Sequence, residues 1–259
     1  MKKGGTIIVF GFCLSALAIQ VTKAMAQERV PEAEGKKVYE RYCQGCHGVE
    51  GDGKGPDSRF LDPQPRDFTR GSFKCRSTPS GSLPTDDDLF RTITRGVHGT
   101  AMPRWRPLLE SERRAVVRYI KTFSKRFQEE KPEPPIVIRE EPPLSPESIA
   151  AGKQVYETAK CWECHGYTGK GDGPSAAKLQ DDLGNPIRPY DFTNPEAFKC
   201  GSSAQDIYRT FTTGMDGTPM PSFTETLSEE QRWQLVHYVM SLRKPVERPI
   251  WSRPFRPRP

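Results

Sequence analysis

The sequence predicts an all-α protein made of two copies of one small domain, in which short helices are joined by long loops. Three observations lead to this prediction. An internal repeat covers most of the chain, apolar residues recur at helical spacing near the start and end of each copy, and the Gly- and Pro-rich segments between them lack the alternation of a β-strand. Because only 34% of the 259 residues are hydrophobic and 25 are proline, a single large core is not expected.

The first 26 residues have the pattern of a secretory signal. Lys2 and Lys3 precede an apolar run at 7–19, and Ala24-Met25-Ala26 places small residues at a cleavage site. We therefore expect export to the periplasm with cleavage after Ala26. An uncleaved membrane anchor is the alternative, because the apolar stretch is nearly long enough to span a bilayer.

Five short segments recur in the same order in the two copies. The pairs are 35–40 with 152–157, 43–48 with 161–166, 67–69 with 191–193, 73–75 with 198–200, and 99–103 with 217–221. We expect two domains, residues 27–124 and 149–242. The linker at 125–148 is rich in proline and acidic residues, so an extended, semi-rigid segment is expected there.

Each domain is expected to begin and end with a helix. Apolar spacing predicts helices over 34–42 and 109–123 in the first copy, and Ser228 with Gln231 predicts a capping box for the last helix of the second. Further helices are expected to start at 86–88 and 202–205. These few helices bury too little apolar surface for a domain of about 100 residues, so something else must contribute to each core.

The C-terminal segment 243–259 combines five prolines with six Lys or Arg residues and is not expected to fold alone. It accounts for most of the formal net charge of +6, and without it and the signal the body is slightly negative. The chain is therefore not predicted to bind nucleic acid. The basic tail could dock on an acidic protein surface or on anionic lipid, or it could simply be solvated.

The motif Cys-x-x-Cys-His occurs twice, at 43–47 and 161–165. It is the attachment sequence for haem c, because two sulfurs three residues apart on a short helix can form thioethers with one haem edge while the next imidazole points at the iron. Chance would produce this motif roughly 0.003 times per chain of this composition, so two copies in register are not accidental. The expected covalent attachment residues are Cys43, Cys46, Cys161 and Cys164, with His47 and His165 as iron ligands.

Two other uses of these cysteines are possible in principle. A zinc site would use Cys43, Cys46, Cys75 and His98. The second copy carries Asp216 at the position of His98, which makes a poor zinc site. A thioredoxin-like redox pair would need strands around the Cys-x-x-Cys segment, and none is predicted.

Haem iron also takes a sixth ligand, and each copy offers a methionine for it. Met102 and Met220 lie in matching Gly-Thr-x-Met-Pro loops, the same distance after the two histidines. His98 and Met215 are rivals in these loops, but neither is repeated. His237, on the last helix, is expected to be exposed to solvent. A thioether ligand favours ferrous iron and so raises the reduction potential.

Cys75 and Cys200 remain after haem attachment, and they occupy equivalent positions in the two copies. In an oxidising compartment they could form a disulfide that joins the domains across a pseudo-twofold axis. They could instead be two separate thiols buried near the haems, and the sequence leaves both alternatives open.

Each copy resembles a class I c-type cytochrome domain, with Gly35 and Tyr119, or Gly152 and Tyr238, where that family crosses its first and last helices. The whole chain resembles the dihaem soluble cytochromes of bacterial respiratory chains. The resemblance implies two tandem domains, each wrapped around a covalently bound haem c. It also implies axial ligation by His47 with Met102 and by His165 with Met220.

The function implied by this resemblance is one-electron transfer with redox-protein donors and acceptors, among them a membrane respiratory complex. No small-molecule substrate and no catalytic residue are then expected. The alternative is a haem enzyme, of the peroxidase or thiosulfate-oxidising type, in which one iron is open or ligated by Cys75 or Cys200. The Gly-rich loop after each histidine and the Phe-Lys-Cys segments depart from the general family pattern.

Overall fold

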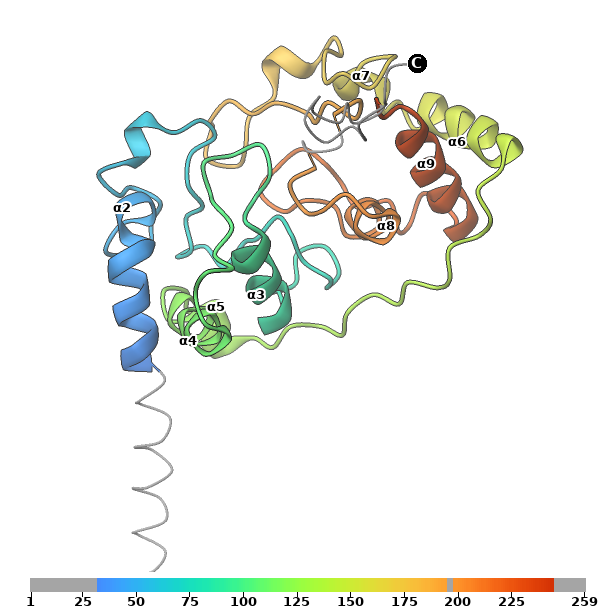
Figure 1. The fold of residues 1–259 in the computed structure, drawn as a ribbon. Helices are drawn as coiled ribbons and strands as arrows, with labels where there is room; N and C mark the ends of the chain where they lie inside the picture. The colour runs from blue at the N-terminus through green and yellow to red at the C-terminus, as the bar shows by residue number, and fades with distance from the viewer. Residues whose placement is uncertain (1–31, 195–197, 245–259) are drawn as a thin grey trace, which may run out of the picture.

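The computed structural model describes residues 32–194 and 198–244, so the expected signal and most of the tail lie outside it. Within these ranges all regular structure is helical, and the β pairing consists of an isolated bridge between Gln180 and Pro186. This confirms the all-α prediction. The helices form two groups, one from each copy of the repeat (Figure 1).

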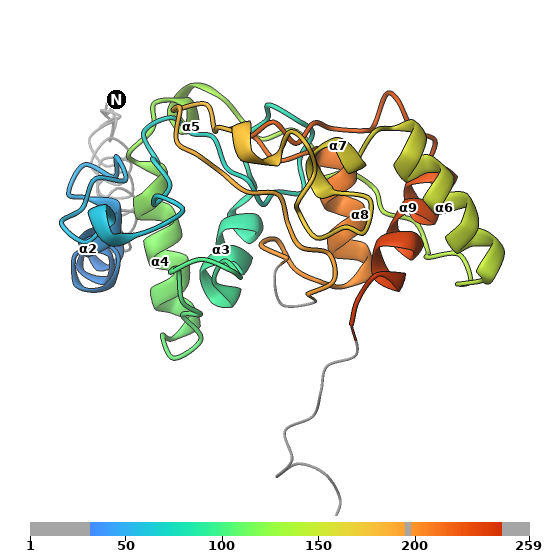
Figure 2. The same cartoon turned by 90° about the horizontal axis from the view of Figure 1, so that it is seen from above.

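The two groups contain equivalent elements. The first comprises helical residues 32–42, α2 (Gln44–His47), the 3₁₀ helix η1 (Ser58–Phe60), α3 (Asp86–Arg95) and α4 (Glu110–Lys121). The second comprises α6 (Pro146–Thr158), α7 (Trp162–His165), the 3₁₀ helix η2 (Ala176–Lys178), α8 (Ala204–Thr213) and α9 (Glu229–Ser241). Viewed from above, α3 and α8 lie at the centre, with α4 and α9 outside them (Figure 2).

Helix starts follow the capping residues of the sequence. Ser228 accepts a hydrogen bond from the backbone N–H of Gln231, whose side chain accepts one from Ser228 N–H, so the predicted capping box of α9 is present. Thr85 and Asp88 form the corresponding box at α3. The first helix of the second copy, α6, begins at Pro146, because Ser145 caps it and Pro146 occupies its first turn.

The first and last helices of each domain cross at a glycine. A Cβ atom on Gly152 would overlap the backbone carbonyl of Gln234 in α9 and lie 2.8 Å from Cβ of Tyr238. A Cβ on Gly35 would likewise overlap the carbonyl of Ala115 and lie 2.9 Å from Cβ of Tyr119. The structure therefore confirms the helix crossings that the family resemblance implied.

Replacing Gly152 by alanine is expected to destabilise the second domain, although alanine is the better helix former by about 1 kcal/mol. The added methyl meets backbone atoms, so α6 must move away from α9, at a cost of about 1–3 kcal/mol. Chemical denaturation followed by circular dichroism measures the change. Lys153→Ala, at an exposed position of the same helix, is the control; a Gly152→Ala protein as stable as this control would contradict the crossing.

Each domain has its own core. The first is formed by Val38, Tyr39, Phe68, Phe73, Leu89, Ile93, Leu108, Val116, Val117 and Ile120. The second is formed mainly by Val155, Tyr156, Phe192, Phe198, Ile207, Tyr208, Phe211, Trp233, Leu235, Val236 and Val239. Cys43 and Met102 pack against the first core and Cys161 and Met220 against the second, so the expected haem residues lie at the edges of the two cores.

The linker is shorter than the sequence predicts. Residues at its start form α5 (Arg126–Glu129), and Phe127 packs against the first core. The segment 130–145 then has no regular structure, and Ile138 packs against the second core. In Figure 1 it runs along the lower edge from α5 to α6. The expected extended character therefore applies only to this second part.

The two domains are joined by a disulfide and by ion pairs. Cys75 and Cys200 form a disulfide, with their Cα atoms 5.2 Å apart. The side chain of Arg76 is fully buried; it pairs with Asp216 at 2.7 Å and donates a hydrogen bond to the carbonyl of Thr213 at 2.7 Å. A buried guanidinium with two such partners is costly to leave unpaired, so these contacts fix the two domains relative to each other.

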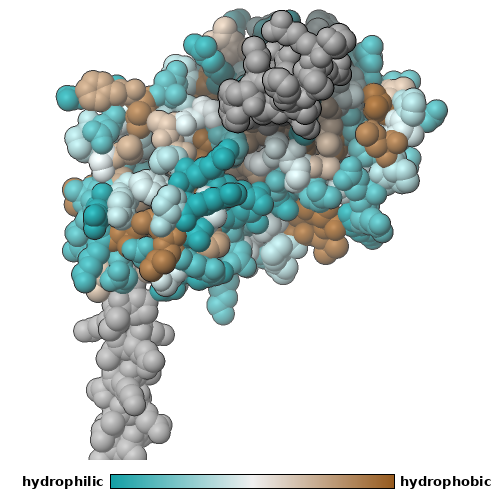
Figure 3. Space-filling model, viewed as in Figure 1, coloured by the Kyte–Doolittle hydropathy of each residue, from teal (hydrophilic) through white to brown (hydrophobic). Residues whose placement is uncertain are grey.

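Much of the surface is polar. The face seen in Figure 3 is largely hydrophilic, with hydrophobic residues in small separate groups. Across the part of the chain that the structure describes, we find no helix with the length and hydrophobicity needed to cross a bilayer.

Candidate haem-binding sites

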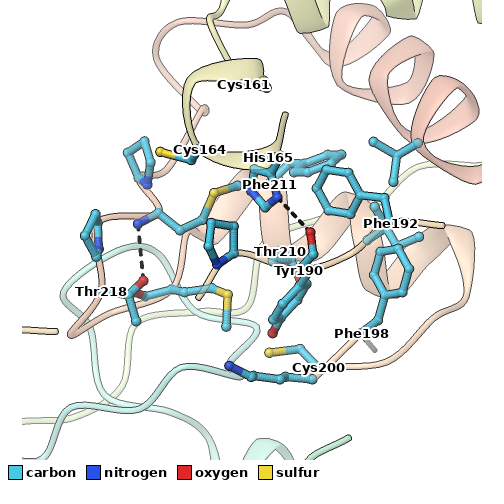
Figure 4. A pocket seen from close by; sticks show the side chains of 18 of the residues that line it. Cys161, Cys164, His165, Tyr190, Phe192, Phe198, Cys200, Thr210, Phe211 and Thr218 are labelled. Atoms are coloured by element: carbon cyan, nitrogen blue, oxygen red, sulfur yellow. Dashed lines mark hydrogen bonds between the residues drawn. The ribbon is translucent and has the colours of Figure 1, made fainter. Parts of the chain in front are cut away.

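The residues expected to hold the second haem come together around one cavity. Cys161, Cys164, His165 and Met220 all line it (Figure 4). Its empty space, including the open mouth, is about 1280 Å³. The sequence had placed these residues as much as 59 positions apart along the chain, and the fold of the second domain brings them together.

Each expected iron-ligating histidine is held by one backbone carbonyl. His165 Nδ1 lies 3.2 Å from the carbonyl oxygen of Tyr190, and His47 Nδ1 lies 3.1 Å from that of Arg66. A ring that donates from Nδ1 keeps Nε2 as the free lone pair that a metal needs. Burial lowers the pKa of His165 to about 4 and also lowers the pKa of His47, so both imidazoles are neutral at pH 7.

The residue two positions after each of these carbonyls packs an aromatic ring against the histidine. The Phe192 ring is stacked on His165 at 4.2 Å between centroids, and Phe68 is stacked on His47 at 4.4 Å. Asp191 shapes this turn by accepting hydrogen bonds from the N–H and hydroxyl of Thr193, and Asp67 does the same in the first copy. The repeated Asp-Phe-Thr segment was visible in the sequence, but its role in orienting the histidines was not predicted.

The Gly-rich loop after each histidine wraps around the attachment helix. Gly53 and Gly171 both have φ +77° and donate backbone hydrogen bonds to the carbonyls of His47 and His165, at 2.9 and 2.8 Å. A side chain is rarely tolerated at such a φ value, which explains the glycines. This loop was noted in the sequence as a departure from the family pattern, and its structural role is to fix the end of each Cys-x-x-Cys-His helix.

The two methionine loops are braced in the same way by a threonine. The hydroxyl of Thr218 donates to the carbonyl of Met215 at 2.7 Å and accepts from the N–H of Met220 at 3.2 Å. Thr100 makes the equivalent pair of hydrogen bonds to Val97 and Met102, at 2.7 and 3.2 Å. The backbone at each methionine is therefore set by its own loop.

None of the four attachment cysteines takes part in a disulfide, so their sulfur atoms are available for thioether bonds. Burial raises the pKa of Cys43 and of Cys161 to about 12, and it also raises the pKa values of Cys46 and Cys164.

Comparison with known proteins identifies the family. The family model for cytochrome c matches residues 149–243, and the model for cytochrome c oxidase, cbb3-type, subunit III matches residues 31–120. A chain of the reducing HAO-like protein complex of Kuenenia stuttgartiensis is similar over 82% of this chain and 96% of its own length, with 51% sequence identity and a TM-score of 0.80. The chain belongs to the dihaem c-type cytochromes. No curated protein gives a significant match to the cytochrome.

The cavity of the second domain fits a haem by its chemistry. Its wall is largely apolar and aromatic, and it presents a cysteine pair and a neutral imidazole. The buried hydroxyl oxygen of Tyr190, close to the backbone of Lys199, makes no well-formed hydrogen bond within the described residues, so it is available to a polar group of a ligand. Cys161 and Cys164 would hold the haem covalently and His165 would bind its iron, which supplies a one-electron ferric/ferrous couple.

In the first domain the expected residues occupy equivalent positions. Cys43 and Met102 pack against the same core, and His47 is stacked on Phe68, a member of that core. Tyr39 donates a hydrogen bond to the carbonyl of Gly48 at 2.7 Å, as Tyr156 does to that of Gly166 at 2.6 Å. The two cytochrome domains therefore present their attachment motifs through the same local contacts.

The two alternative uses of the cysteines that the sequence left possible in principle are not supported. In the zinc alternative, Cys75 and Cys200 would be ligands, but they are joined in a disulfide. Asp216, the remaining ligand in the second copy, is paired with Arg76. Within residues 32–194 and 198–244, no three His, Cys, Asp or Glu side chains are grouped to hold a metal ion directly. The thioredoxin alternative requires strands, and the described ranges contain only helices and one isolated bridge.

The prediction that His237 is exposed was wrong. Its side chain is 1% exposed; Nδ1 lies 2.6 Å from the Ser148 hydroxyl and Nε2 lies 3.6 Å from Glu141. The reason is that α6 and the end of the linker cover this face of α9. Met215 is buried in the second cavity, so it remains a rival to Met220 in position as well as in sequence.

Proposed function

We propose that this cytochrome carries single electrons between redox proteins through two haems that are each ligated by histidine and methionine. The observation that carries the proposal is the second cavity, where a carbonyl-oriented His165 and a threonine-braced Met220 line the same space. If both axial positions are filled by the chain, no position is left for a substrate. A ligand on a fixed loop also limits rearrangement between redox states.

We further propose that the protein works in the periplasm, exported by the signal at residues 1–26. Haem c attachment and the disulfide between Cys75 and Cys200 both suit an oxidising compartment outside the cytoplasm. The respiratory chain of a bacterium is the setting that this placement favours.

The partner that we propose is a larger redox enzyme. The similar chain from Kuenenia stuttgartiensis is part of a reducing HAO-like protein complex. By analogy, this cytochrome would exchange electrons with an oxidoreductase subunit or with a membrane respiratory complex. The only described residues of the basic tail are Arg243 and Lys244. The Arg243 side chain donates a hydrogen bond to the carbonyl of Ser202, and the backbone N–H of Lys244 donates one to the carbonyl of Thr193, both in the second domain.

The enzymatic alternative has two forms, one with an open iron and one with an iron ligated by Cys75 or Cys200. A Cys-ligated haem would need Cys75 or Cys200 as a thiolate, and both are joined in the disulfide. A peroxidase-type enzyme would therefore need one iron from which methionine is absent or easily displaced.

Carbon monoxide binding tests the proposal on the reduced, fully loaded protein. A haem with both axial positions filled must first release its methionine, so we expect slow and weak binding at both haems. Rapid binding of one equivalent of carbon monoxide would contradict the proposal and favour an enzyme with one open iron. Stopped-flow absorbance, with the two haems counted independently, distinguishes these outcomes.

A further inference from the structure

One lysine of the first domain lies in the haem cavity of the second. Lys74 lines that cavity together with Lys199, its equivalent in the second copy. Each lysine directly precedes a cysteine of the disulfide, Cys75 or Cys200, so the disulfide holds both lysines in one region. Cys200 itself lines the cavity, at the end away from Cys164 in the view of Figure 4.

The charges on the cavity wall all have the same sign. The charged lining residues are Lys74, Lys160, Arg188 and Lys199, and among the described residues that line the cavity none is Asp or Glu. A haem brings two carboxylates, so the cavity and its ligand are complementary in charge.

Lys74 and Lys199 differ from the other two cations, because Lys160 and Arg188 are exposed to solvent and Lys160 also pairs with Glu163. Lys74 and Lys199 are both partly buried, and neither forms a salt bridge with a described residue. Burial lowers the pKa of Lys74 to about 8, with further lowering by the nearby charges of Arg66 and Lys199. Burial also lowers the pKa of Lys199. The nearby carboxylates of Asp181 and Asp182 raise the pKa of Lys74, and that of Asp62 raises the pKa of Lys199. None of these carboxylates forms a salt bridge with the lysine that it affects.

Such a cluster of like charges is unfavourable unless an anion compensates it. The buried hydroxyl of Tyr190, without a well-formed hydrogen bond, lies on the wall of the same cavity, and the ring of Tyr190 lies 5.3 Å from the Lys199 ammonium. The ammonium groups of Lys74 and Lys199 and the hydroxyl of Tyr190, all groups that can donate hydrogen bonds to a carboxylate, therefore line one cavity.

We propose that Lys74 acts across the domain boundary as a charge-compensating residue of the second haem. With Lys199 it offers positive charge to the haem carboxylates, and this charge raises the reduction potential of that haem, because reduction removes one positive charge from the iron. A residue of the first domain thus raises the reduction potential of the second haem, and the disulfide keeps this lysine in position.

Potentiometric titration of the full-length, dihaem protein tests this proposal. The Met102→His variant serves as background, because it is expected to move the first haem to low potential and leave the second as the upper wave. In this background Lys74→Gln is expected to reduce the equilibrium constant for reduction of the second haem about fivefold to tenfold. Lys74→Arg, which keeps the charge, is expected to restore most of it.

The control is Lys125→Gln, which removes the same charge from an exposed position at the start of α5. The proposal is overturned if Lys74→Gln shifts the second wave no more than this control, or if Lys74→Gln and Lys74→Arg shift it equally. Lys74→Met replaces Lys74→Gln if the latter does not fold. Met102→His alone reports on the ligation of the first haem, so a failure of the proposed His/Met ligation is seen separately.

A second measurement uses the disulfide. In a Cys75→Ser/Cys200→Ser protein, Lys74 is no longer tied to the cavity, so the effect of Lys74→Gln on the second wave is expected to shrink. An effect of unchanged size would show that the disulfide does not position the lysine.

Discussion

Replacing Cys161 and Cys164 together by serine is expected to leave the exported protein with one covalent haem instead of two. Serine hydroxyls cannot form the thioethers, and the cavity between them and Met220 would lose the large apolar group that completes the second core. We also expect the second domain to lose much of its stability, while the first keeps its haem. Haem absorbance per chain after extraction with acidified organic solvent, together with the mass of the intact protein, measures the change.

The matched control for this experiment is the Cys75→Ser/Cys200→Ser protein, which removes the same number of sulfurs. It is expected to keep both haems, because these cysteines form the interdomain disulfide. If the Cys161/Cys164 variant still carried two haems that resist extraction, the assignment of the second attachment site would be wrong.

Replacing Met220 by histidine is expected to lower the reduction potential of the second haem by on the order of 0.1 V or more, and to leave the first nearly unchanged. Thioether stabilises ferrous iron more than imidazole does. The loop should survive the substitution, because Thr218 braces it through the backbone N–H and not through the side chain of Met220. A spectroelectrochemical titration resolves the two waves, and Met102→His should move the other one.

Met215→Leu is the control for this prediction, because Met215 is buried in the same cavity. It is expected to keep the wild-type potential. If Met215→Leu lowered the potential and Met220→His did not, the ligand would be Met215. A single wave that moved as a whole in every variant would contradict two independent redox modules.

Much of the local structure could be predicted from the sequence. The capping box at Ser228 and the start of α3 at Asp86 agree with expectation, as do the helix crossings at Gly35 and Gly152 that the family resemblance implied. These features depend on side chains only a few residues apart, or on a glycine where two backbones must touch. The burial of His237 could not be predicted in this way, because it depends on how the linker and α6 cover α9.

The sequence alone determined the cofactor chemistry, because covalent haem attachment needs only five consecutive residues, and these occur twice. The tertiary structure decided the contacts between distant residues. It placed the backbone carbonyls of Arg66 and Tyr190 within hydrogen-bond distance of the two histidines. Every residue type has such a carbonyl, so the sequence does not indicate which one is used. The tertiary structure also joined Cys75 to Cys200 across 125 positions and thereby placed Lys74 on the wall of the second cavity. Such pairings depend on the path of the chain in space, which no local pattern specifies.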